Sequence, residues 1–158
     1  MIYFLRAEEI DSEQSWQLLT WCAAHGGTEF FVRQMSLQGL PEPNLDQAAA
    51  VLSPYRLPPG VRPRTVEYDG RPDSEITELW RLSTESIQVL RSLFPSGLFE
   101  SPTYDSGGWL EEPTVFRENR VLFGVVSHEG EAFMDLADEE VSDLRLLGFR
   151  FHPRGFWI

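Results

Sequence analysis

His128 and Glu131 are the residues whose types and spacing best fit catalysis, because they flank the turn dipeptide Glu129-Gly130. A two-residue turn there would pair His128 with Glu131 on one face of a β-hairpin, with their Cβ atoms about 5 Å apart. A carboxylate at that distance holds an imidazole and raises its pKa, as the partner of a general base does. With Asp105 nearby, the pair predicts a small hydrolase. The simpler interpretation, which the sequence favours, is a charge pair that closes the hairpin.

Other reaction centres find little support in the sequence. A metal site made of His128, Glu131 and Asp135 is a weaker prediction, because the three histidines of the chain show no metal-ligand spacing. Cys22 is the single cysteine, lies near the C-terminal end of an expected helix and is predicted to belong to the core. The chain has no lysine, which excludes Schiff-base chemistry, and it has no phosphate-binding or serine-nucleophile motif. We therefore expect no cofactor and no metal.

A second candidate is the segment 104–112, which combines aromatic residues, glycines and carboxylates. Aromatic side chains anchor protein interfaces, and an acidic rim attracts basic partners. The alternative is a loop whose aromatic side chains turn back into the core. The candidate partner-binding residues are Tyr104, Asp105, Trp109, Glu111 and Glu112.

The charge of the chain limits the kinds of partner it can have. Asp and Glu number 25 against 13 arginines, so the net charge is -12, and the excess is spread along the chain. Such a surface repels nucleic acid and anionic membranes and attracts cationic partners. The cluster Arg62-Pro63-Arg64 is too small to reverse this. The alternative is that acidity only keeps the protein soluble.

The elements that position these residues can be read from hydrophobic periodicity and capping signals. They predict one domain over 1–158, with a Pro-rich surface loop at 53–64. The fold class is α+β, with a mainly antiparallel sheet and a C-terminal β-meander covered by about four helices. The expected helices are 13–25, 45–52, 85–94 and 138–147. Their expected N-cap residues are, in the same order, Asp11 or Ser12, Asn44, Ser83 or Thr84, and Asp138. The expected strands are 2–7, 28–38, 65–69, 75–82, 98–104, 109–117, 120–128, 131–136 and 149–152.

Together these features predict an acidic, non-catalytic protein-binding domain whose partner is a basic protein. Bacterial immunity proteins against nuclease toxins, and acidic inhibitors in general, share this overall profile, which is one of composition rather than of a motif. The short apolar run at Met1–Arg6 is below the length of a signal peptide or a membrane span, so a cytoplasmic location is expected. One alternative is the hydrolase. Another is a homo-oligomeric structural protein, such as a homodimer, in which strand 2–7 or 149–152 pairs between subunits.

Overall fold

The computed structural model describes residues 1–35, 43–58, 67–68, 71–72, 78–102 and 108–153. Several sequence predictions fall outside these residues and have no structural outcome. They concern Tyr104, Asp105 and the cluster Arg62-Pro63-Arg64.

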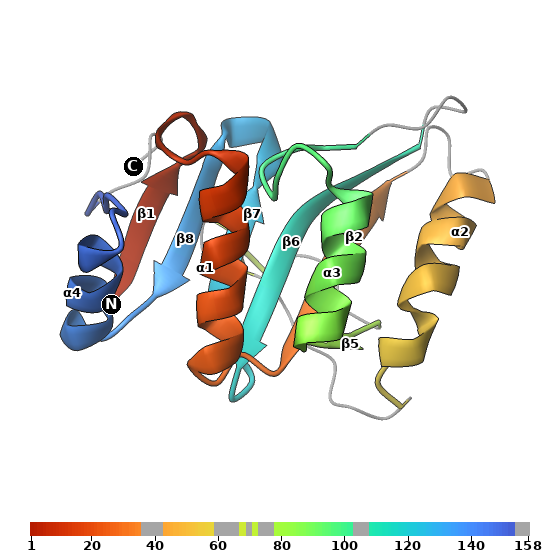
Figure 1. The fold of residues 1–158 in the computed structure, drawn as a ribbon, viewed down its shortest axis with the longest axis horizontal. Helices are drawn as coiled ribbons and strands as arrows, with labels where there is room; N and C mark the ends of the chain where they lie inside the picture. The colour runs from red at the N-terminus through yellow and green to blue at the C-terminus, as the bar shows by residue number, and fades with distance from the viewer. Residues whose placement is uncertain (36–42, 59–66, 69–70, 73–77, 103–107, 154–158) are drawn as a thin grey trace.

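A six-stranded antiparallel sheet forms the centre of the fold, in the order β1-β8-β7-β6-β2-β5 (Figure 1). The β6-β7-β8 meander and the α+β class are as the sequence predicts. A two-stranded sheet, β3 (Glu67–Tyr68) with β4 (Arg71–Pro72), is separate. The strands of the large sheet are β1 (Ile2–Arg6), β2 (Glu29–Met35), β5 (Trp80–Arg81), β6 (Trp109–Arg117), β7 (Arg120–Val126) and β8 (Glu131–Asp135).

Three helices cover one face of the sheet, and a fourth lies beside its β1 edge (Figure 1). The three are α1 (Ser12–Ala24), α2 (Pro43–Leu52) and α3 (Thr84–Leu93), and the fourth is α4 (Asp138–Leu146). The elements η1 (Ala7–Glu9), η3 (Ser53–Tyr55) and η4 (Ser127–Glu129) are short 3-10 turns.

The caps of two helices agree with the sequence and those of the other two do not. The Asp11 side chain accepts a hydrogen bond from the Gln14 amide, and Ser83 accepts one from Ser86. By contrast, α2 begins at Pro43, so Asn44 lies inside the helix. In α4 the N-cap is Ala137, whose amide donates to Glu140 Oε2 at 2.9 Å, and Asp138 is already helical. Asp138 therefore does not cap the helix, and the Glu140 carboxylate accepts the amide of the N-cap residue instead.

The core fills the layer between the sheet and the helices. Cys22 is fully buried there, as predicted, and burial raises the pKa of its thiol, so the reactive thiolate is disfavoured. The sheet contributes β7 at its centre, whose Phe123 and Val125 are fully buried. Other core members include Leu5, Trp16, Leu18, Leu19, Phe30, Ile87, Leu90, Val115 and Met134.

Four segments differ from the sequence prediction. Of the described part of the expected strand 75–82, only Trp80–Arg81 is a strand. Residues 98–99 form a turn and 100–102 have no regular structure, where the start of a strand was expected. The expected strand at 149–152 is reduced to a single bridge, in which Phe4 and His152 exchange backbone hydrogen bonds of 2.9 and 2.8 Å. The described part of the Pro-rich loop includes the η3 turn and a bridge between Arg56 and Trp80. In each case the segment finds tertiary partners that local composition does not reveal.

Replacement of Gly27 tests how closely the end of α1 packs on the sheet. A Cβ at this position would lie 2.6 Å from the Cys22 carbonyl oxygen and 2.9 Å from Val115 Cγ1. Because backbone cannot yield as a flexible side chain does, Gly27→Ala should lower the free energy of unfolding by about 2 kcal/mol or more. Gly130→Ala is the control, since its nearest neighbour is 3.8 Å away and only its φ of 65° opposes a side chain, for a loss of about 1 kcal/mol. Urea unfolding measures both, and equal losses would contradict the packing shown.

Candidate functional site

The structure brings residues from both sequence-predicted candidate sites to one end of the sheet. Glu112 comes from β6, and His128 from η4, the turn that joins β7 to β8. Arg33 of β2 and Ser127 of η4 complete the group. We call these four residues the Glu112 site.

A β-bulge places Glu112 in an unusual backbone conformation. The register of β2 on β6 passes from Phe31 opposite Thr114 to Arg33 opposite Glu111, so β6 carries one extra residue at this point. Glu112 has φ 55°, in the left-handed region that non-glycine residues rarely adopt. Such a conformation costs about 1–3 kcal/mol and persists only where surrounding contacts impose it.

Four contacts impose it here. Arg33 Nε lies 2.9 Å from Glu112 Oε2, and His128 Nδ1 lies 3.2 Å from Oε1. The Glu112 amide donates to Ser127 Oγ at 3.1 Å, and Thr114 Oγ1 donates to the Glu112 carbonyl oxygen at 3.1 Å. Both carboxylate oxygens and both backbone polar groups of Glu112 are therefore engaged, and the residue ties β2 and η4 to β6.

Burial dominates the electrostatics of the site. Glu112 is only 5 % exposed. Desolvation raises the pKa of its carboxyl, and the neighbouring charge of Glu111 adds to the rise, while Arg33 and His128 oppose it. Because the pKa is raised on balance, the two cationic neighbours do not fully compensate for the loss of hydration. The ionised carboxylate is held at a cost to the fold.

His128 has the geometry of a ring that a carboxylate orients. Its Nδ1 faces Glu112, while the side chain is 66 % exposed and its Nε2 lies 3.8 Å from Glu129 Oε1. A buried carboxylate on one ring nitrogen, with the other nitrogen near solvent, is the arrangement of a general base and its orienting partner. The site can therefore accept a proton from a water molecule or a hydroxyl group at Nε2.

The partner of His128 differs from the one predicted. β7 and β8 pair Val126 with Glu131, so the predicted register of His128 opposite Glu131 is wrong. The reason is the turn: Ser127–Glu129 coil into a 3-10 turn that ends at Gly130, with φ 65°, and the connection is longer than two residues. Glu131 is buried and stands opposite Arg6 of β1.

The predicted metal trio is not assembled. Asp135 lies at the far end of β8, where its carboxylate contacts Arg120 at 2.6 Å and the N-terminal amine at 3.1 Å. Among the residues that the structure describes, no group of three or more His, Cys, Asp or Glu side chains is arranged to hold a metal ion.

The partner-binding candidates divide into an inward and an outward set. Glu112 is buried and engaged within the chain, so it can affect a partner only by fixing the shape of β6. Trp109 and Glu111 are partly exposed on the same strand, and the Trp109 indole Nε1 donates to Glu111 Oε2 at 2.9 Å. This contact holds an aromatic ring and a carboxylate side by side, as an interface for a cationic side chain requires.

Sequence reasoning missed Arg33 and Ser127. Arg33 follows three apolar residues in a strand, and a charge at that position could have indicated a buried acidic partner. Ser127 lies next to His128 and gave no signal, because its role depends on the shape of the turn.

Replacing Glu112 with glutamine tests the electrostatic balance of the site. A raised folded-state pKa means that the stability supplied by protonated Glu112 is present at acid pH and is lost as the pH rises through that pKa. The free energy of unfolding of the wild type should therefore fall, relative to Glu112→Gln, as the pH rises above the range in which an ordinary glutamate titrates. Urea unfolding from that range upward in pH measures the difference, with exposed Glu85→Gln as the control. A difference that rises with pH would refute the balance described above.

No comparison with known proteins assigns a chemistry to the site. Among the described residues, no helix combines the length and the apolar character that crossing a bilayer requires. No protein-family model, no curated protein and no solved structure matches the chain.

Proposed function

We propose that the protein is an acidic, non-catalytic binding domain that holds a basic protein partner in the cytoplasm, as inhibitors and immunity-type proteins do. The observation that carries the proposal is the way the arginines are used. Five of the 13 arginines form ion pairs with carboxylates of the same chain, and the 25 Asp and Glu residues leave an excess of acidic side chains. The ion pairs are Arg33–Glu112, Arg56–Glu78, Arg91–Glu13, Arg117–Glu140 and Arg120–Asp135.

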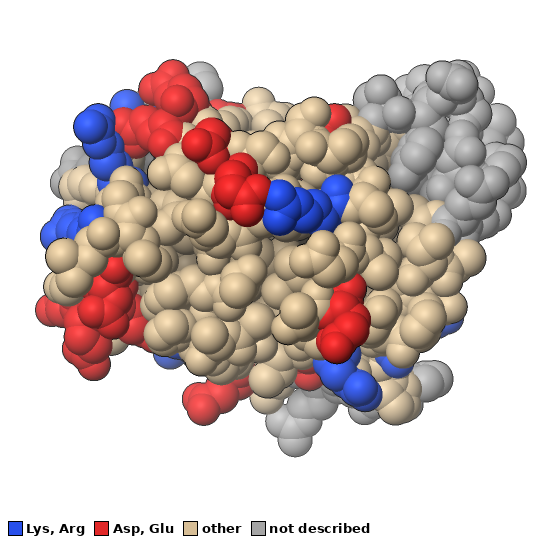
Figure 2. Space-filling model, in the orientation of Figure 1, with Lys and Arg blue, Asp and Glu red and all other residues tan. Residues whose placement is uncertain are grey.

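Exposed carboxylates outside these pairs gather near β1. In Figure 2 acidic side chains gather, with arginines among them, on the side of the molecule where η1 and α4 lie. Glu8 is exposed in η1, and Glu139 and Asp143 are exposed on α4. A negative surface of this kind raises the association rate of a cationic protein and orients its approach. The same potential opposes nucleic acid and anionic membranes.

Neutralising this side of the molecule tests the proposal. We expect the wild type to capture a basic protein from native lysate at about 50 mM salt and to release it at about 500 mM. The triple variant Glu8→Gln, Glu139→Gln, Asp143→Asn should retain at least about tenfold less of that protein. These three side chains are exposed, so folding should not be affected.

The matched control removes three charges elsewhere, with Glu85→Gln, Glu118→Gln and Glu129→Gln, and should capture as the wild type does. Quantitative mass spectrometry of the eluates provides the measurement. The proposal fails if no basic protein is enriched, or if the two triple variants behave alike.

A second candidate is a small hydrolase, and the contact between His128 and buried Glu112 favours it. In this function His128 Nε2 removes a proton from water as the water attacks the substrate, and Glu112 replaces Glu131 as the orienting carboxylate. Asp105, the third residue of the sequence hypothesis, lies outside the described residues.

Removal of the imidazole separates the two functions. If the protein hydrolyses any member of a panel of ester, amide and phosphodiester substrates, His128→Ala should lower the rate by about 100-fold or more. Its melting temperature should fall only slightly, because the side chain is mostly exposed and Arg33 remains beside Glu112. His25→Gln is the control. A wild-type protein without activity, or activity that survives in His128→Ala, rejects the hydrolase.

A further inference from the structure

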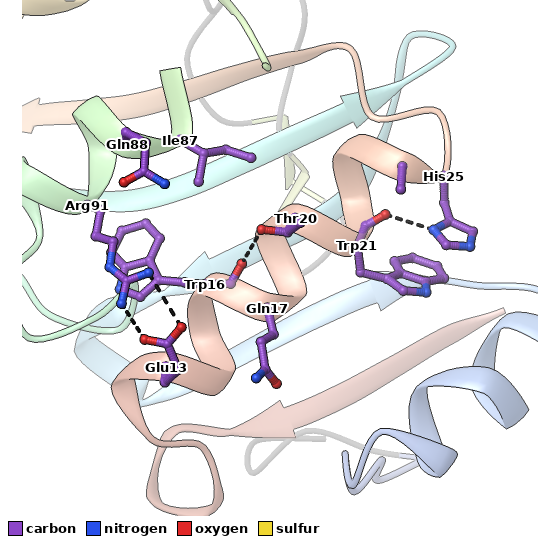
Figure 3. A pocket seen from close by; sticks show the side chains of 10 residues that line it. Glu13, Trp16, Gln17, Thr20, Trp21, His25, Ile87, Gln88 and Arg91 are labelled. Atoms are coloured by element: carbon purple, nitrogen blue, oxygen red, sulfur yellow. Dashed lines mark hydrogen bonds and ion pairs between the residues drawn. The ribbon is translucent and has the colours of Figure 1, made fainter. Parts of the chain in front are cut away.

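A groove of about 320 Å³ runs between α1 and α3 on the outer side of the helical layer (Figure 3). The buried side chains of Trp16 and Ile87 line it, and the outer positions are held by exposed Gln17, Thr20 and Gln88. It is bounded at one end by an ion pair between Glu13 and Arg91. At the other end His25 stacks on Trp21, with ring centroids 3.9 Å apart.

The groove is poor in charge although the protein is rich in it. Charged residues make up 24% of the chain, which has a net charge of -12. Of the ten residues that line the groove only Glu13 and Arg91 are Asp, Glu, Lys or Arg, and they form an ion pair with each other. In Figure 2, which has the orientation of Figure 1, most of the surface over α1 and α3 is formed by uncharged residues. Depletion of charge, together with aromatic and arginine side chains, is the compositional mark of the centre of a protein interface.

We propose that a second copy of this chain docks on the α1–α3 face. Two copies of a molecule with charge -12 repel each other wherever acidic surfaces meet, so they can approach only where the local charge is balanced. A basic partner has the opposite preference and is attracted to the acidic side near η1 and α4. The balanced face is therefore the one suited to a like-charged copy.

The face is also complementary to itself. A two-fold axis brings each group opposite its counterpart, so Glu13 of one copy can meet Arg91 of the partner copy, and the reverse pair forms at the same time. The amides of Gln17 and Gln88 both donate and accept hydrogen bonds, so they can pair with one another across the axis. Arg91 already lies over the Trp16 ring, 6.0 Å from its centroid, and this contact orients its guanidinium.

The size of the face sets the strength of the dimer. The 13 residues of α1 and the 10 of α3 span about 20 and 15 Å. Side by side they offer less than the ~800 Å² per partner of a standard stable interface. The dimer is therefore weak and reversible, and it leaves the acidic side near η1 and α4 free.

Sedimentation velocity on the full chain between about 1 and 300 µM tests the dimer at two salt concentrations. We expect the mass to rise with concentration from 18.1 kDa toward twice that value. Raising the salt from about 20 to 300 mM should tighten the dimer severalfold, because screening weakens the repulsion between like-charged copies. Capture of a basic partner responds to salt in the opposite direction, so failure of one proposal is distinguishable from failure of the other. A protein that stays monomeric throughout overturns the inference.

Charge changes on the face locate the interface. Gln17→Glu with Gln88→Glu adds two negative charges to each copy and should weaken association at least about tenfold. The control, Thr28→Glu with Ser142→Glu, adds the same charge outside the groove and should dimerise as the wild type does, apart from the general repulsion. Equal weakening by the two double variants would place the interface elsewhere.

Charge reversal tests whether the occupant is a second copy. E13R gives the face two positive charges and R91E gives it two negative charges, so each variant alone should be monomeric. An equimolar mixture should associate more tightly than either variant separately. Circular dichroism melts verify that both variants fold. Two folded variants that do not associate when mixed would overturn the proposed two-fold pairing.

Discussion

The pairing of β6 with both β2 and β7 is the interaction on which the rest of the structure depends. β2 comes from the first quarter of the chain and β7 follows β6 directly, so β6 joins the N-terminal part of the sheet to the C-terminal meander. The two pairings do not share one regular register. One bulge places an extra residue on β6 near Glu112, and another places an extra residue on β7 near Leu122. Glu112 lies at the first of these bulges, in the pairing of β6 with β2.

The energetics of Glu112 argue that stability alone does not account for it. Its left-handed backbone is strained, and burial of its carboxylate outweighs the attraction of Arg33 and His128. A buried ion pair often contributes less than well-packed apolar side chains of similar volume would. A strained residue with a raised pKa beside an exposed histidine is the kind of feature that clusters at functional sites. These features make Glu112 and His128 the centre of the candidate functional site.

The elements that could be predicted from the sequence are those that local sequence patterns determine. The helices follow from apolar periodicity and from caps such as Asp11 and Ser83, and the meander follows from three apolar runs separated by turn signals. Local patterns do not determine the length of the turn after β7. A glycine with positive φ fits a two-residue turn as well as the 3-10 turn that forms, and the difference moves His128 from Glu131 to Glu112.

The candidate site could be predicted only in part for the same reason. Trp109, Glu111, Glu112 and His128 were all identified, but as members of two separate hypotheses. The contact between Arg33 and Glu112 joins residues 79 positions apart in the sequence, and it depends on the bulge in β6. No local pattern encodes such a pairing, because it arises from the register of two strands that meet only in the folded sheet.

The acidic side chains of the surface fall into two groups: those whose charge stabilises a helix and those whose charge has no such role. Glu13, Glu85 and Glu139 lie in the first turns of α1, α3 and α4, where a negative charge stabilises the helix dipole by about 0.3–1 kcal/mol each. Glu8 in the short η1 turn and Asp143 beyond the first turn of α4 gain no such stabilisation. The folding of the chain does not explain their charge. The argument for a basic partner is therefore strongest at these two residues, whereas Glu139 combines both roles.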